Sequence, residues 1–243
     1  GSECQSFALI SDNATHQKMA CGDPKAMAKV AILDPELTLS QPPRVTACTG
    51  IDAIAHAVET AVTRKRNETS LKYSRAAFQM MLENFSRVLK SPDDLEARGQ
   101  MLLGAAYAGT AIEHSMLGAA HSAANPLTAH FDVIHGQAVG MMLPHVVRFN
   151  AEEETVAEGY AALVKDTAVA SSNGTLSAEA LAQAMEALLD SANLPRDLTA
   201  FGVDANQLDV LSKEAAQQWT ASFNPREITA ADFTGLYQKA FAS

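Results

Sequence analysis

The sequence has few cysteines, and they form no recognisable pattern. Cys4, Cys21 and Cys48 are odd in number and widely spaced, so the chain contains neither a CxxC motif nor a disulfide framework. Structural disulfides are typical of oxidising compartments. We therefore expect a protein of the reducing cytoplasm.

The sequence also lacks an excess of positive charge and long apolar runs. Its formal net charge is −10 at pH 7, and the basic residues are scattered apart from Arg64-Lys65-Arg66. This charge argues against a nucleic-acid surface, and the short basic run follows an apolar helix pattern, where the helix dipole favours cations. No apolar segment approaches the roughly 18 residues that a membrane-spanning helix needs. We expect neither nucleic acid nor a membrane as a partner.

The chain has enough apolar residues for a large core, and its first part differs from the rest. Its 243 residues are 47% hydrophobic and 19% charged, which suits one large domain or two small ones. Residues 6–10 and 28–33 are strand-like, and residues 11–13 and 22–24 are turn-like. A ribbon this small buries too little apolar surface to be a domain, so residues 1–38 are expected to be a β remnant of a larger sheet.

From about Pro42 onward the pattern is helical. Apolar residues at helical spacing predict a helix around residues 51–62 and another over residues 70–90. Ser91 is predicted to cap a third helix that runs to about His114. Further helices are expected near residues 115–127, 137–150, 152–170, 177–192, 205–220 and 229–241. The predicted fold class is therefore mainly α, with a helical bundle over residues 39–243.

One carboxylate and three imidazoles are the candidate metal-binding side chains of this sequence. Asp52 and His56 are four residues apart, which places both on one helix face. His121 and His135 follow, fourteen residues apart. Such a nitrogen and oxygen set suits a divalent metal ion such as Fe²⁺ or Zn²⁺. Taken singly, these residues also fit an ordinary surface ion pair or core histidines, and the same holds for His114, His130 and His145.

The joint pattern resembles the iron-containing (group III) alcohol dehydrogenases. Residues 50–59, GIDAIAHAVE, resemble the GxDAxxHAxE helix of that family. Residues 118–127 resemble its GxxHxxAHPLG segment, and residues 135–146 resemble its HGxAxxxxLPHV segment. Residues 31–35 resemble its sheet-ending strand, and residues 224–226 with the final helix resemble its C-terminal end.

This resemblance implies a metal-dependent, NAD(P)-linked alcohol dehydrogenase that acts on a small alcohol or aldehyde and forms a homodimer. In that family the metal lowers the pKa of the bound alcohol, and hydride passes to NAD or NADP. The implied fold is the helical C-terminal domain of that family, which packs against a dinucleotide-binding domain. The implied ligands of Fe²⁺ or Zn²⁺ are Asp52, His56, His121 and His135.

The sequence departs from the family pattern in two respects. Asn125 stands where the family usually has a histidine near the substrate, and an amide does not titrate near neutral pH. The Gly-rich phosphate turn of the dinucleotide-binding domain is also missing. Gly1-Ser2-Glu3 match the end of the family's GTGSE motif, which makes Gly1 and Ser2 candidate cofactor contacts. We expect a truncated piece of a longer enzyme that is inactive alone.

Other assignments stay open at this point. His130 lies between two implied ligands in sequence and is a candidate for the route of the alcohol proton. A maleylacetate-reductase-like enzyme of the same superfamily would need basic residues facing the cleft. A non-enzymatic metal-binding helical domain would have no need of a nucleotide domain. Glycerol-type dehydrogenases use a different ligand set, so the D-x₃-H…H-x₁₃-H pattern favours the alcohol dehydrogenases.

Overall fold

Helices dominate the structure, a computed structural model that describes residues 1–11, 18–169 and 177–241. This confirms the predicted mainly α fold class. The predicted turn residues Asp12 and Asn13 lie outside the described residues. The helices are α1 (Pro43–Thr60), α2 (Glu68–Lys90), α3 (Leu95–Ser115), α4 (Ala119–Phe131), α5 (His135–Asn150), α6 (Glu154–Val164), α8 (Ala178–Ser191), α9 (Leu208–Gln217) and α10 (Ala230–Ala240).

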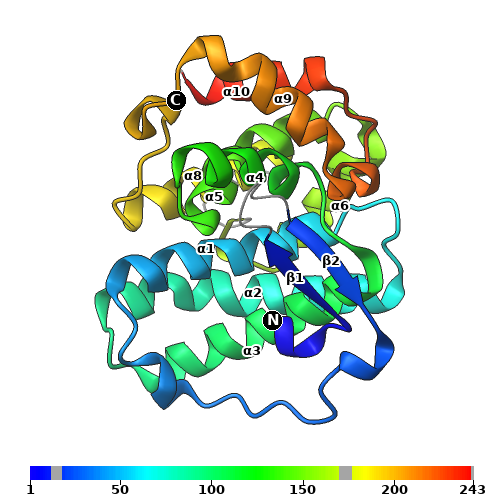
Figure 1. Cartoon of the computed structure of the whole chain (residues 1–243). Coiled ribbons are helices and arrows are strands. Elements are labelled where there is room, and N and C mark those ends of the chain that lie inside the picture. Colours follow the sequence, from blue (N-terminus) through cyan, green and yellow to red (C-terminus); the bar gives the residue numbers. More distant parts are fainter. Residues whose placement is uncertain (12–17, 170–176, 242–243) are drawn as a thin grey trace.

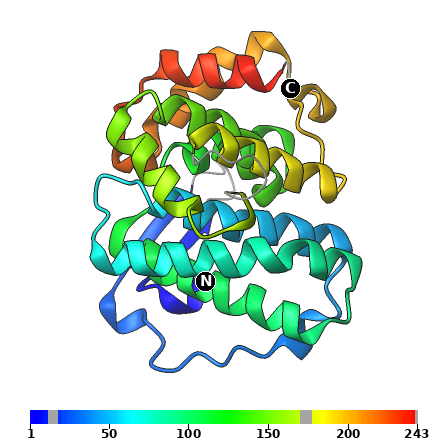
Figure 2. The ribbon, with the colours of Figure 1, turned by 180° about the vertical axis from the view of Figure 1, so that it is seen from behind.

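Helix α1 joins two groups of helices. It packs against α2 and α3 on one side and against α5 on the other, and its residues Ile54 and Val58 are fully buried. Helices α4, α5 and α8 form the second group, and α9 and α10 lie beyond them (Figures 1 and 2). Among the helices that the structure describes, none combines the length and apolar character that a membrane span requires.

Side-chain caps fix where several helices begin. The Asn67 side chain accepts a hydrogen bond from the backbone N–H of Ser70, and the Ser70 hydroxyl accepts one from the backbone N–H of Asn67. Together the two bonds form a capping box for α2. Helix α3 begins at Leu95 because Asp94 accepts from the Ala97 amide. The prediction of Ser91 as the cap of α3 was therefore wrong. Asp94 lies next to the first helical residue, and an acceptor there reaches the free amides.

Loss of the α2 cap should weaken the fold measurably. We expect Asn67→Ala to lower the free energy of unfolding by about 1–2 kcal/mol, because the Ser70 amide loses its acceptor. The side-chain nitrogen of Asn67 also donates to the backbone carbonyl of His114 at 2.9 Å, so the variant loses a hydrogen bond between the start of α2 and the end of α3. Urea unfolding measures the change. Thr69→Ala, at an exposed position of the same turn, is the control and should stay within about 0.5 kcal/mol of wild type.

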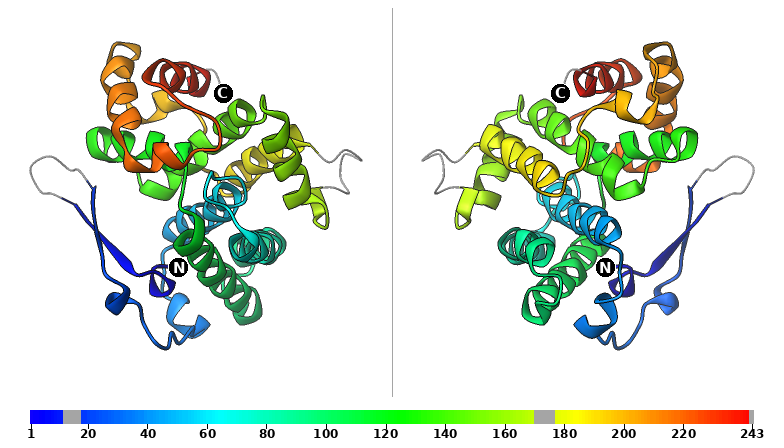
Figure 3. Two further views of the ribbon diagram at one scale, coloured as in Figure 1. Left: turned by 90° about the vertical axis from the view of Figure 1, so that its right-hand side faces the viewer. Right: turned by 90° about the vertical axis from the view of Figure 1, so that its left-hand side faces the viewer.

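The N-terminal segment is a two-stranded ribbon beside the helices. Strand β1 (Phe7–Ser11) pairs antiparallel with β2 (Lys18–Gly22), and Figure 3 shows this hairpin standing at the side of the bundle. The predicted strand over residues 28–33 is wrong: these residues are irregular, with Val30 79% and Ile32 88% exposed. A strand requires a neighbouring strand for its hydrogen bonds, and among the described residues β1 and β2 pair only with each other.

Candidate metal centre

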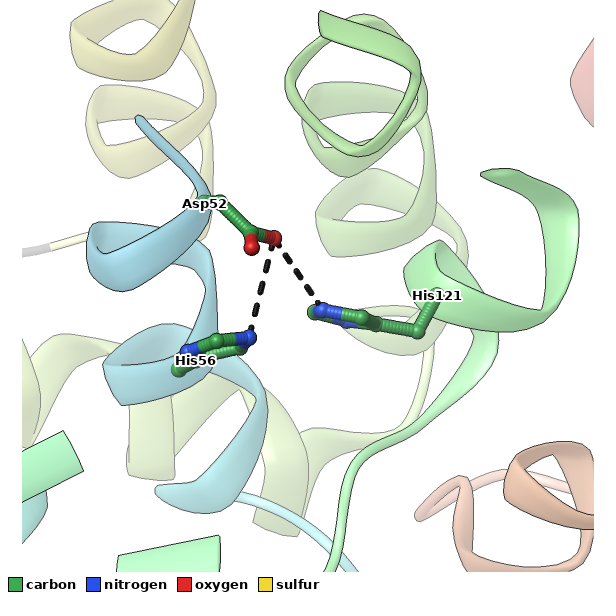
Figure 4. A group of neighbouring side chains, drawn as sticks. All are labelled: Asp52, His56 and His121. Carbon is green, nitrogen blue, oxygen red and sulfur yellow. Dashed lines mark ion pairs between the residues drawn. The ribbon is translucent and has the colours of Figure 1, made fainter. Parts of the chain in front are cut away.

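Four side chains from three helices converge at one point. Asp52 and His56 project from successive turns of α1, His121 from the first turn of α4, and His135 is the first residue of α5. Asp52 Oδ1 lies 3.3 Å from His121 Nε2 and 3.6 Å from His56 Nε2 (Figure 4). The same oxygen lies 3.9 Å from His135 Nε2. The structure thus brings together all four residues that the sequence pattern singles out.

Close packing of α5 on α1 places His135 beside the other three. Gly136 follows His135, and an added Cβ at Gly136 would collide with the backbone carbonyl of Cys48 and lie 3.1 Å from Asp52 Cβ. Only a residue without a side chain allows the two backbones to approach this closely. The imidazole ring of His135 also lies beside that of His121 on α4, with the ring centroids 5.4 Å apart.

Two atoms at the centre of this cluster are buried and unsatisfied. Within the part of the chain that the structure describes, neither Asp52 Oδ1 nor His121 Nε2 has a hydrogen-bond partner. A buried polar atom left unpaired costs about 1–3 kcal/mol, and a divalent cation would serve as the common partner of both atoms. One carboxylate oxygen and three imidazole nitrogens are donors that Fe²⁺ and Zn²⁺ accept. The residues present fit such an ion.

Burial and neighbouring charges set the protonation of the cluster. Burial lowers the pKa of His56 to about 4, which leaves its imidazole neutral at pH 7. Burial alone favours the protonated form of Asp52. At the low pH where His56 and His121 both carry a positive charge, that charge outweighs burial and holds the Asp52 pKa far below its usual range. For His121, burial is outweighed by Glu59 and Asp52, which raise its pKa to about 9.

Glu59 belongs to this site, although the sequence reasoning gave it no role. Its side chain is buried, with Oε2 2.5 Å from His121 Nδ1, and Oε1 accepts from the Ala120 amide at 2.7 Å. A signal for it exists in the sequence: Glu59 follows His56 by three residues and therefore lies on the same face of α1. An acidic residue within this otherwise apolar stretch of helix indicates a buried partner.

A cavity of about 590 Å³ opens beside the cluster. All four clustered residues line it, and so do Gly1 and Ser2. Its apolar walls include Phe85, Val88, Met101 and Leu102. Trp219 lines it as well, with its ring edge-on to that of Phe7 at a centroid distance of 6.3 Å. The cavity therefore has a polar part, formed by the clustered side chains, and an apolar part.

The two further residues singled out in the sequence lie in different places. Asn125 lines the cavity, and its amide nitrogen donates to Gln218 Oε1 at 3.0 Å. His130 lies outside the cavity lining, on the exposed surface, where its Nε2 is 2.7 Å from Glu214 Oε2. The structure brings Asn125 to the site but not His130.

Comparisons with known proteins agree with this arrangement. Residues 46–241 match the sequence profile of the C-terminal part of the Fe-containing alcohol dehydrogenase family. The chain is 31% identical to long-chain-alcohol dehydrogenase 1 of Geobacillus thermodenitrificans and 29% identical to the NAD-dependent methanol dehydrogenase of Bacillus methanolicus. These alignments cover 100% and 99% of this chain but only 61% and 63% of those relatives.

The fold is shared with solved structures of the same kind. A 1,3-propanediol oxidoreductase superposes with a TM-score of 0.91 at 25% identity, over 98% of this chain and 62% of that protein. An iron-containing alcohol dehydrogenase from Thermococcus thioreducens superposes with a TM-score of 0.89 at 24% identity, over 100% and 62%. The chain therefore spans about three fifths of these proteins. It belongs to the Fe-containing alcohol dehydrogenase family and corresponds to the C-terminal part of that family.

Proposed function

We propose that this chain is the metal-binding part of a metal-dependent, NAD(P)-linked alcohol dehydrogenase that interconverts small alcohols and aldehydes. The observation that carries the proposal is the convergence of three imidazole Nε2 atoms on one buried carboxylate oxygen. The proposed ligands of Fe²⁺ or Zn²⁺ are Asp52, His56, His121 and His135. Relatives named for methanol and for butanol support a small alcohol as the substrate.

The chain's own residues supply binding and orientation. A divalent cation held by the four ligands supplies Lewis-acid chemistry toward the oxygen of an alcohol or aldehyde. The apolar walls, such as Phe85 and Met101, accept the carbon part of the substrate and restrict water. Asn125, held by Gln218, places an amide on the same cavity and orients the substrate without exchanging a proton near neutral pH.

We further propose a division of the chain at residue 38. Residues 39–243 form the helical metal-binding domain, and residues 1–38 belong to the part that binds the cofactor. Gly1 and Ser2 line the same cavity as the metal ligands, which supports a contact with NAD or NADP there. Relatives named as NAD-dependent and NADPH-dependent enzymes support a nicotinamide cofactor. The 243 residues alone are expected to show no turnover.

Metal content tests the proposal directly. After loading with Zn²⁺ and removal of excess metal, we expect about one ion per wild-type chain, and far less in His135→Ala, because the variant loses one ligand. His130→Ala is the matched control: it removes an exposed histidine outside the cavity and should keep the wild-type content. Elemental analysis gives the result. A wild-type chain that retains no metal, or a His135→Ala variant that retains all of it, would contradict the proposal.

A further inference from the structure

Glu59 is a buried carboxylate beside the metal ligands that the proposed ligand set does not use. We propose that it is the positioning residue of the centre: it holds the ring and the backbone of His121 so that Nε2 faces the ion. This inference rests on the proposed metal centre and adds a determinant of its affinity. Three observations carry it: the contact with the ring, the contact with the helix start and the balance of charge.

The contact with the ring fixes which nitrogen is available. Glu59 Oε2 lies 2.5 Å from His121 Nδ1. An ionised carboxylate only accepts hydrogen bonds, so Nδ1 keeps its hydrogen in either charge state of the ring, and Nε2 is the nitrogen that gives up its proton when a cation binds. His121 Nε2 is the atom that faces Asp52 Oδ1, 3.3 Å away. A carboxylate behind a metal-binding imidazole is the arrangement that orients the ring and strengthens its donation.

The contact between Glu59 and the backbone of α4 fixes the position of His121. Helix α4 starts after Gly118, which has no side chain to cap the free amides. Glu59 Oε1 accepts from the Ala120 amide at 2.7 Å, and Asn224 Oδ1 accepts from the Ala119 amide at 3.3 Å. A Cβ on Gly118 would lie 3.1 Å from Glu59 Oε1, so a capping side chain there would crowd it. Glu59 therefore caps the turn that carries His121.

Charge balance favours a dication at this place. Asp52 and Glu59 approach opposite nitrogens of the same imidazole. Glu59 is 3% exposed, and water contributes little to stabilising its charge. The positive end of α4 compensates part of that charge, and a divalent cation beside Asp52 compensates more. Removal of the Glu59 charge should therefore weaken cation binding even though Glu59 is not a ligand.

Glu59→Gln separates these effects from simple packing, because it is nearly isosteric. An amide offers one acceptor oxygen where the carboxylate offers two, so either the Ala120 amide or His121 Nδ1 faces an NH₂ group. We expect Zn²⁺ affinity, measured by competition with a chelator on the full chain, to fall by about 10–100-fold. Ser74→Ala is the matched control. This variant removes the buried hydrogen bond of 2.7 Å between Ser74 Oγ and Thr60 Oγ1. Thr60 follows Glu59 in the sequence, but the variant leaves Glu59 itself unchanged, so the Zn²⁺ affinity should stay at the wild-type value.

A second measurement needs no variant. Nitrogen NMR of ¹⁵N-histidine-labelled, Zn²⁺-loaded wild type should show His121 with its hydrogen on Nδ1 and the metal on Nε2. The opposite assignment would overturn the inference, and so would a Glu59→Gln chain that binds Zn²⁺ as tightly as wild type. Failure of the wild type itself to bind Zn²⁺ would instead reject the proposed metal centre and this inference with it. The two failures are thus distinguishable.

Discussion

Saturating Zn²⁺ is expected to raise the melting temperature of the wild-type chain by about 8–16 °C, and Asp52→Asn should abolish that shift. A ligand present at 1,000 times its dissociation constant stabilises the folded state by about 4 kcal/mol, and each kcal/mol moves the midpoint of a chain of this size by about 2–4 °C. Asparagine removes the negative charge from the point that three imidazole nitrogens surround. Thermal unfolding followed by circular dichroism, with Zn²⁺ or with EDTA, measures the shift.

The comparison must be made within each variant. Asp52→Asn also changes the metal-free chain, because it removes a buried carboxylate whose charge His121 stabilises there. Only the difference between the Zn²⁺ and EDTA midpoints isolates binding. His130→Ala should reproduce the wild-type difference. A full shift in Asp52→Asn would show that Zn²⁺ binds elsewhere and would exclude Asp52 as a ligand.

Gly136→Ala should destabilise the chain by about 3 kcal/mol and weaken Zn²⁺ binding at the same time. The new methyl group would collide with the Cys48 carbonyl, which belongs to the backbone of α1 and cannot rotate away. Helix α5 must then move off α1, and His135, the preceding residue, moves with it. Urea unfolding and chelator competition measure the two effects on the same preparations.

Gly235→Ala is the matched control, because it adds the same methyl group to another helix. Nothing lies within 4 Å of the position that its Cβ would take in α10. Alanine is a better helix former than glycine, so this variant should be more stable than wild type by up to about 1 kcal/mol. Its Zn²⁺ affinity should not change. Equal destabilisation by both variants would contradict the close approach of α5 to α1.

The features that depend on local sequence were predictable, and those that depend on distant partners were not. Helical periodicity is visible within one segment, so the helices and the mainly α class followed from it. The strand expected over residues 28–33 has the right composition, but a strand forms only beside another strand. The role of Glu59 depends on the start of α4, which lies 61 residues away from it at Ala120.

Helix geometry explains which predicted site residues the structure brings together. Asn125 is four residues after His121 and lies on the same face of α4, toward the cavity. His130 is nine residues after His121, and nine steps of about 100° place it on the opposite face. Nearness in sequence suggested His130, whereas its angular position on the helix assigned it to the surface. The same rule applied to the sequence would have excluded it.

The position of Trp219 has a practical consequence. It is the only tryptophan in the sequence, and it lines the cavity that the four clustered side chains share. Tryptophan fluorescence from this chain therefore originates at one known point on the cavity wall, beside the ring of Phe7. The native chain thus carries a built-in optical reporter, so that the filling of the cavity is observable without an attached dye or an engineered residue.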